Sequence, residues 1–205
     1  MNPGYLSYIL ITLSVILVCS GWHHQAIGSF SVRGALTFVG IWLLAGWLHW
    51  ESSGGMSGSF VYVPLLLLTI ASYRICEHSG MERFTALTFS LLLGAVVSLV
   101  QLIEMTDPVW IIFHPFYDPL IIAGMLTLGY TRSPSLQFGI VTAGLVGSDL
   151  FLALLPMVPH REIGERAFQD AWWVTAVSVR TGSVFLAAGQ AVMRNSAVRW
   201  LRRQK

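Results

Sequence analysis

The sequence predicts an all-α integral membrane protein, a bundle of about seven transmembrane helices, and three observations support this fold class. Hydrophobic residues make up 55% of the 205-residue chain and charged residues only 11%, whereas a soluble domain carries about 25% charged residues. The mean hydropathy is +0.67. The apolar residues are gathered in runs close to the roughly 20 residues that a helix needs to cross a bilayer. We therefore expect lipid to surround most of the protein.

The expected spans follow one another with short loops between them: 4–22, 33–50, 60–76, 84–103, 108–130, 136–157 and 171–193. No Lys or Arg precedes the first run, so we expect a retained span and not a secretory signal. Pro115 and Pro119 interrupt the fifth run, which forms either one span or a re-entrant segment followed by a shorter helix. The chain is thus predicted as one helix-bundle domain over 1–193, followed by a basic cytoplasmic tail over 194–205.

The distribution of Lys and Arg predicts the orientation, because cytoplasmic segments of membrane proteins accumulate these residues. If the N-terminus lies outside, nine of the twelve cations fall in inner segments: Arg33, Arg74, Arg83, Arg132, Arg194, Arg199, Arg202, Arg203 and Lys205. The outer loops then hold only Arg161 and Arg166. We therefore expect a multi-pass plasma-membrane protein with its N-terminus outside, its C-terminus in the cytoplasm and an odd number of spans.

Arg180 is a charged residue inside the last expected span. Counting 1.5 Å of rise per residue from the outer surface places Arg180, Asp149, Asp118 and His114 in one layer of the outer leaflet, with Glu104 just above it. Because an unpaired charge in the bilayer costs at least about 2.5–3.5 kcal/mol, we expect Arg180 to pair with Asp149, Asp118 or both. The cluster is either a structural bridge or a polar site for a substrate, an ion or a proton, with His114 titrating near neutral pH.

No cofactor and no metal site are predicted. The sequence contains no nucleotide-binding loop, HExxH motif or recognisable Ser/His triad, and His23 and His24 have no carboxylate or cysteine near them in their loop. Cys19 and Cys76 lie in separate apolar runs without CxxC spacing. No basic stripe with interleaved aromatics indicates nucleic acid. The expected partner is the lipid bilayer, and the sequence leaves open a membrane-protein partner or a homo-oligomer.

Two short motifs resemble those of intramembrane aspartyl proteases. The Tyr-Asp dipeptide ending at Asp118 and the Gly-Ser-Asp tripeptide ending at Asp149 are similar to the Tyr-Asp and Gly-x-Gly-Asp motifs of that family. The resemblance implies two aspartates that share a proton and activate water. Ser148 stands where the family has glycine, no Pro-Ala-Leu sequence follows, and a neighbouring Arg180 would hold both aspartates ionised.

A second resemblance covers the layout of the whole chain. The segment DPVWIIFHPFYDPL at 107–120 and the tail RNSAVRWLRRQK at 194–205, together with the length and the number of spans, resemble the YphA-type small membrane proteins of endospore-forming Gram-positive bacteria. The resemblance implies a plasma-membrane protein connected with the cell or spore envelope. It carries over no catalytic residues.

Three functions from different classes fit these observations. The short loops and the absence of a soluble catalytic domain favour a membrane protein without catalytic activity, which acts through helix, lipid or protein-partner contacts. The alternative is a small-solute transporter or binding component whose site is formed by Arg180, Asp149, Asp118 and His114, because broken helices line many transporter sites. The third is an intramembrane enzyme, either the aspartyl protease or a lipid-modifying enzyme.

Overall fold

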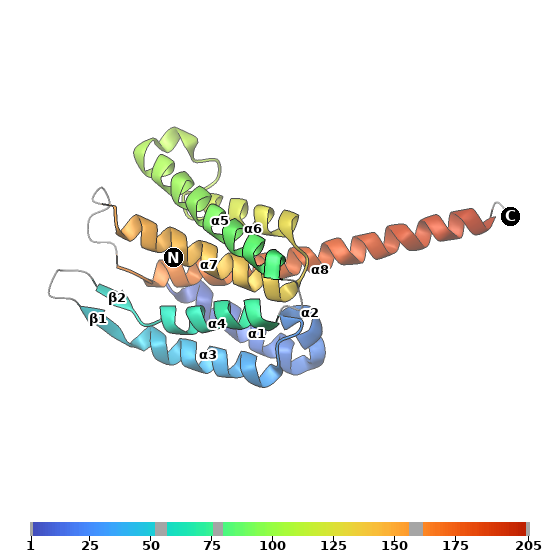
Figure 1. The fold of residues 1–205 in the computed structure, drawn as a ribbon, viewed down its shortest axis with the longest axis horizontal. Helices are drawn as coiled ribbons and strands as arrows, with labels where there is room; N and C mark the ends of the chain where they lie inside the picture. The colour runs from blue at the N-terminus through green and yellow to red at the C-terminus, as the bar shows by residue number, and fades with distance from the viewer. Residues whose placement is uncertain (1, 52–56, 76–79, 156–161, 204–205) are drawn as a thin grey trace.

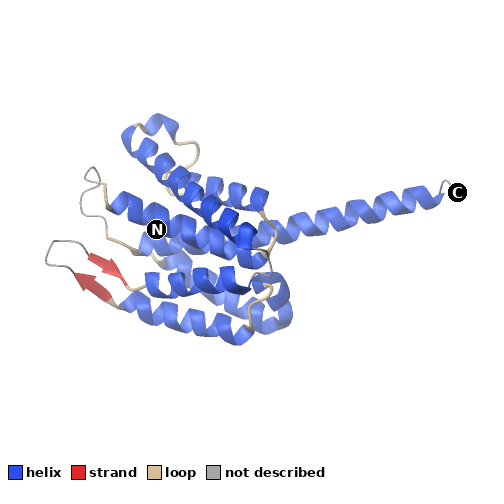
Figure 2. Ribbon diagram, in the orientation of Figure 1, coloured by secondary structure: helices blue, strands red, loops and turns tan. Residues whose placement is uncertain are grey.

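Helices dominate the chain, as expected for apolar segments whose backbone polar groups must all be bonded within the protein. The computed structural model describes residues 2–51, 57–75, 80–155 and 162–203 (Figures 1 and 2). The helices are α1 (Tyr5–Leu17), α2 (His23–Ile27), α3 (Val32–Trp47), α4 (Tyr62–Ile75), α5 (Gly80–Thr106), α6 (Asp118–Tyr130), α7 (Pro134–Ala153) and α8 (Arg166–Arg203). The predicted mostly helical architecture is confirmed.

Short elements of other kinds lie at the helix ends. A π-helical turn, Val18–Trp22, joins α1 to α2, and a 3₁₀ turn, Pro108–Trp110, lies between α5 and α6. Strands β1 (His49–Glu51) and β2 (Ser57–Ser59) form an antiparallel hairpin between α3 and α4. The segment before α8 adds to this hairpin through a parallel bridge from Gly58 to Ile163.

Three helical segments are long and apolar enough to cross a membrane: Tyr5–Ile27, Gly80–Thr106 and Pro134–Ala153. Helices α3, α4 and α6 are apolar but shorter. Of the two alternatives for 108–130, a single continuous helix is not formed: the chain is irregular between the 3₁₀ turn and Asp118, where the shorter helix α6 begins. Helix α8 continues through the basic segment as far as Arg203 and projects beyond the bundle (Figure 1).

The contacts of α7 with α4 show that neighbouring helices run in opposite directions. Asp149, near the end of α7, bonds Tyr62 at the start of α4, whereas Gly139, near the start of α7, lies against Tyr73 in the last turn of α4. The same alternation continues through α1, α3, α4, α5, α6, α7 and α8 in chain order (Figure 1). The first and last helices are therefore parallel, and their N-terminal ends lie on the same face of the molecule.

The core lies where α7 crosses α5. A Cβ atom added to Gly94 of α5 would lie 2.8 Å from the backbone oxygen of Gly144 on α7, so only glycine permits this approach of the two backbones. Leu93, Val97 and Ile140 are buried around the crossing. Helix α7 is thus the central helix, and it carries both Gln137 and Asp149 on buried positions.

Candidate functional site

Arg180 lies on α8, is 9% exposed, and donates only to uncharged oxygens. Its Nε donates to the carbonyl oxygen of Ala26 at 3.1 Å, its Nη1 to Oε1 of Gln137 at 2.8 Å, and its Nη2 to the carbonyl oxygen of Gln25. Among the described residues no carboxylate forms a salt bridge or hydrogen bond with this guanidinium. The expected pairing of Arg180 with Asp149 or Asp118 is therefore wrong.

The end of α2 takes the place of the expected carboxylate. The last carbonyl groups of a helix have no partner within the helix and carry a partial negative charge. Helix α2 is short because glycines flank it: Gly21 has φ 94° and Gly28 has φ 61°, a region that glycine enters without steric cost. These two breaks aim the carbonyls of Gln25 and Ala26 at Arg180.

Distance along α7 explains why Arg180 cannot reach Asp149. Its partner Gln137 is in the first turn of α7 and Asp149 in the last turns, twelve residues or about 18 Å apart along the helix axis. The prediction that Arg180 and Asp149 lie in one layer was wrong because the count of rise per residue assumed upright helices and placed the outer surface at residue 171. In the fold, α8 crosses α7, and Arg180 lies near the opposite end of the bundle from Asp149.

Asp118 instead binds the backbone of the segment that precedes it. Its carboxylate accepts the N–H of Ile112 at 2.7 Å, of Phe113 at 3.1 and 3.2 Å, and of His114 at 3.3 Å. The side chain is 4% exposed and lies in the first turn of α6, where the helix dipole stabilises negative charge.

His114 and Glu104 lie at the same end of the bundle as Asp118. His114 accepts the N–H of Phe116 through Nδ1 at 3.1 Å. Glu104, near the end of α5, is 6% exposed, lies within electrostatic range of Asp118, and its Oε2 has no hydrogen-bond partner among the described residues. The structure thus brings together three of the five predicted site residues.

Asp149 lies at a third site, apart from the site of Arg180 and from the site of Asp118. Its carboxylate is 2% exposed and accepts from the hydroxyl of Tyr62 and from the N–H of Gly164 at 3.0 Å. It therefore ties α7 to α4 and to the segment before α8. Asp118 and Asp149 share no hydrogen bond in the described chain, and each carboxylate accepts from backbone N–H groups of its own.

Sequence reasoning missed Asp170, which is 5% exposed at the start of α8. Its two carboxylate oxygens accept the N–H of Gly4 and of Ser7, both at 2.7 Å, and the hydroxyl of Ser7 at 2.6 Å. The carboxylate thus caps the N-terminus of α1 from another helix. The signal was an aspartate directly before the apolar run that begins at 171.

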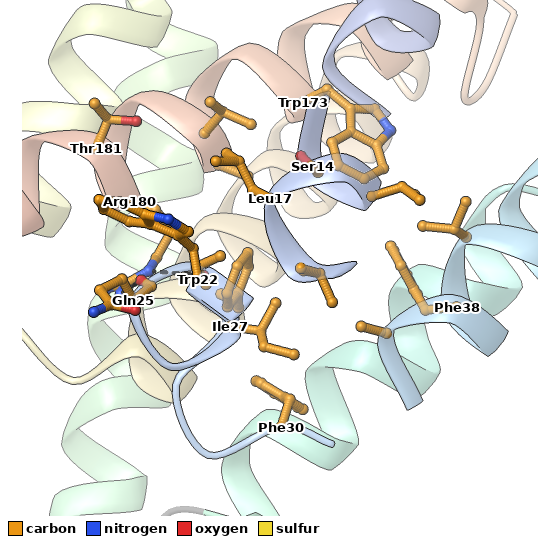
Figure 3. Close-up of a pocket in the computed structure, with 18 of the residues that line it drawn as sticks. Ser14, Leu17, Trp22, Gln25, Ile27, Phe30, Phe38, Trp173, Arg180 and Thr181 are labelled. Carbon is orange, nitrogen blue, oxygen red and sulfur yellow. Dashed lines mark hydrogen bonds between the residues drawn. The ribbon is translucent and has the colours of Figure 1, made fainter. Parts of the chain in front are cut away.

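A cavity of about 360 Å³ lies between α1, α2, α3 and α8, beside Arg180 (Figure 3). We call it the Arg180 groove. Arg180 and Gln25 lie at one end, and the aromatic rings of Phe30, Phe38 and Trp173 lie around the rest. Other lining residues are exposed on the outside of the bundle: Trp22, Leu36 and Phe185. The cavity is therefore an apolar groove, open on one side, with a cation at one end.

Comparison with known proteins identifies the family. A family model described as YphA-like integral membrane protein matches residues 36–205. The chain belongs to this family. The resemblance inferred from the 107–120 segment, the basic tail and the overall layout is thereby confirmed. No curated protein and no solved structure matches the chain.

Membership of the YphA-like integral membrane proteins identifies the medium around the bundle. The chain is therefore a membrane protein, as its long apolar helices also indicate. The matched region contains Arg180 and Gln137 but begins within α3. The carbonyl partners Gln25 and Ala26 lie before it, so α1 and α2 complete the groove from outside the region that the family model matches.

Proposed function

We propose that this YphA-like protein is a multi-pass plasma-membrane protein without catalytic activity, and that it binds an anionic lipid in the Arg180 groove. The observation that carries the proposal is a cation with uncharged partners at the end of an apolar groove whose opening is lined by exposed apolar side chains. Basic pockets between transmembrane helices are known binding sites for anionic headgroups.

The charge of Arg180 supports an anionic ligand. A guanidinium has five N–H groups, and Arg180 uses one on each of its three nitrogens. One N–H on Nη1 and one on Nη2 therefore have no partner among the described residues. Arg180 lines the groove, and arginine can bind a phosphate through two N–H groups at once, so the two remaining donors support an anionic ligand.

The shape and lining of the groove support a lipid chain over a small polar solute. The volume of about 360 Å³ is within the range of ligand pockets, roughly 300–1,000 Å³, but nearly all of the lining is aliphatic or aromatic. The polar layer that a solute site would have used is divided among three places in the fold. The small-solute alternative therefore has less support than lipid binding.

Helix directions support seven crossings with the N-terminus outside. The alternating helices put the two ends of the chain on opposite faces (Figure 1), and the face with the C-terminal end also carries Arg33, at the start of α3, and Arg132, before α7. Arg180 lies near this cationic face. The lipid headgroup would then come from the cytoplasmic leaflet, which holds anionic lipids.

The test compares lipid binding by four variants in nanodiscs of phosphatidylcholine with and without phosphatidylglycerol. We expect Arg180→Gln, which removes the cation, and Ala35→Phe, which fills the groove from α3, to lose the phosphatidylglycerol that native mass spectrometry detects on the wild-type protein. Arg132→Gln is the matched control, because Arg132 also bonds a glutamine oxygen, that of Gln190. Ala188→Phe is the control for size, on an exposed face of α8 outside the groove.

Three outcomes would contradict the proposal. They are equal retention of the two lipids by the wild-type protein, retention unchanged in both groove variants, and equal loss in the controls. Inorganic phosphate added to the sample tests whether the groove recognises only the anionic headgroup or the whole lipid. If phosphate displaces phosphatidylglycerol, the groove recognises the anion alone, and the acyl chains of the lipid contribute nothing to binding.

A further inference from the structure

Helix α2 and the residues on either side of it are held to the bundle by few contacts. All residues from 19 to 31 are described, and none of them is buried. Among the described residues, two hydrogen bonds join this segment to helices distant in the chain, and Arg180 donates both. Near its end, the ring of Phe30 packs on that of Phe138, with centroids 6.0 Å apart. A segment with so little buried surface has a low free energy of local opening.

Two glycines mark the points at which this segment can pivot. Gly21 precedes α2 with φ 94°, and Gly28 follows it with φ 61°. Glycine adopts positive and negative φ with equal ease, so the backbone at either position can change its direction. The π-helical turn Val18–Trp22 also interrupts regular helical hydrogen bonding at the first of them. Helix α2 can therefore move as a short rigid unit between two hinges.

Two consecutive carbonyl groups of α2 occupy one edge of the Arg180 guanidinium (Figure 3). Nε donates to the carbonyl oxygen of Ala26 at 3.1 Å, and Nη2 donates to that of Gln25. Nη2 is the terminal nitrogen on the same side as the Nε N–H. Through two neighbouring nitrogens of this kind, arginine binds two oxygens of a carboxylate or phosphate with parallel N–H bonds. The two carbonyl oxygens thus lie where two oxygens of an anion would bind.

An anion gains donors when α2 moves away. Arg180 has five N–H groups and uses three of them, two for carbonyl groups of α2 and one for Gln137. Two donors are free with α2 in place, and release of α2 raises this number to four. Release also removes two carbonyl oxygens whose partial negative charge opposes an anion. An anion therefore binds the released form more tightly, which is the condition for a ligand to shift such an equilibrium.

We propose that α2 is an autoinhibitory strap: its carbonyl groups bind Arg180 in place of a ligand, and an anionic lipid headgroup at Arg180 displaces them and releases α2. The inference rests on the proposed lipid binding in the Arg180 groove and adds how access to that site is regulated. Ala26 and Ile27 line the groove, so movement of α2 also removes part of its wall. By reciprocity, a change that detaches α2 strengthens binding of the anion.

The test measures a distance between α2 and α8 by pulsed electron paramagnetic resonance. Spin labels are attached to His24→Cys and Ala188→Cys, both at exposed positions. The chain also carries Cys19→Ser and Cys76→Ser and is placed in phosphatidylcholine nanodiscs. We expect a longer distance when phosphatidylglycerol is included. In the control pair, Thr37→Cys, exposed on α3, replaces the label on α2, and the distance should not change.

Two variants shift the strap without a ligand. Arg180→Gln removes the donors that hold α2, so the α2–α8 distance should already be long in phosphatidylcholine and should not respond to phosphatidylglycerol. Gly21→Ala keeps Arg180, and no described atom lies within 4 Å of its added Cβ, but alanine disfavours φ of 94°. It should lengthen the distance and tighten phosphatidylglycerol binding by up to about tenfold. Gly189→Ala on α8, which also has no described atom within 4 Å, is the matched control and should change neither value.

Native mass spectrometry of the same samples separates failure of the strap from failure of lipid binding. If the wild-type protein retains phosphatidylglycerol and the α2–α8 distance is unchanged, the strap is overturned and lipid binding stands. If the wild-type protein does not prefer phosphatidylglycerol, both proposals fail. Equal lengthening in the control pair would mean that the whole bundle rearranges, and it would overturn the strap. If Arg180→Gln does not fold, Gly21→Ala decides, because an unchanged distance and an unchanged affinity in this variant contradict the proposal.

Discussion

At the scale of residues, three buried charges in this protein are stabilised by helix ends and backbone groups. Asp170 binds the first N–H groups of α1, Asp118 binds N–H groups next to the start of α6, and Arg180 binds the last carbonyls of α2. Each sign matches the dipole of the helix end that it contacts. A helix end supplies partners without a second ionised side chain, so an oppositely charged residue on a neighbouring span is no guide to pairing.

A double-mutant cycle distinguishes the observed partner of Arg180 from the expected one. We expect Arg180→Gln and Gln137→Leu to be coupled by about 0.5–3 kcal/mol in the free energy of unfolding, because their side chains are in direct contact. Arg180→Gln and Asp149→Asn should be additive within about 0.5 kcal/mol, since the two sites are remote. Denaturation in detergent, followed by circular dichroism, gives these values. Coupling of Arg180 to Asp149 alone would restore the Arg–Asp bridge.

At the scale of elements, glycine determines how the central helices meet and where helices stop. Gly94 and Gly144 let α5 and α7 approach within backbone contact. Gly21 and Gly28, both with positive φ, separate α2 from α1 and α3. The first pair sets the core, and the second pair orients the carbonyls that bind Arg180.

Substitution of Gly94 tests the α5–α7 crossing. Gly94→Ala places a methyl group 2.8 Å from a backbone oxygen of α7, so we expect it to destabilise the fold by about 1–3 kcal/mol, as overpacking does. Gly147→Ala on α7 is the matched control, because no described atom lies within 4 Å of its added Cβ. Alanine favours helix over glycine by about 1 kcal/mol, so the control should be neutral or stabilising. Thermal unfolding in detergent measures both, and equal effects would mean that the two helices do not meet in this way.

At the scale of the whole molecule, the alternation of helix direction places the chain ends on opposite faces. The 38 residues of α8 extend over about 57 Å, more than the roughly 30 Å of hydrocarbon, and the C-terminal part projects beyond the bundle (Figure 1). Its basic end is therefore carried away from the helix bundle on the face that we propose to be cytoplasmic.

Cysteine labelling in intact cells tests this orientation. We expect Glu51→Cys, on the hairpin between α3 and α4, to react with a membrane-impermeant maleimide, and Arg132→Cys, between α6 and α7, to react only after permeabilisation. Both positions are exposed, and the native cysteines are replaced by serine in each variant. The reverse pattern would place the N-terminus in the cytoplasm, and labelling of both in intact cells would contradict a spanning bundle.

The sequence by itself determined the fold class, the membrane environment and the family, because these depend on composition and on the length of apolar runs. It also located most helices. Of the five residues that it grouped in one layer, the fold keeps His114, Asp118 and Glu104 at one end, because these three are near one another along the chain. Only the tertiary structure decided the partners of Arg180, Asp149 and Asp170. Each of their contacts joins distant segments, and its geometry depends on helix crossing angles and on glycine breaks. Rise per residue measures distance along one helix, but it does not place two tilted helices relative to each other.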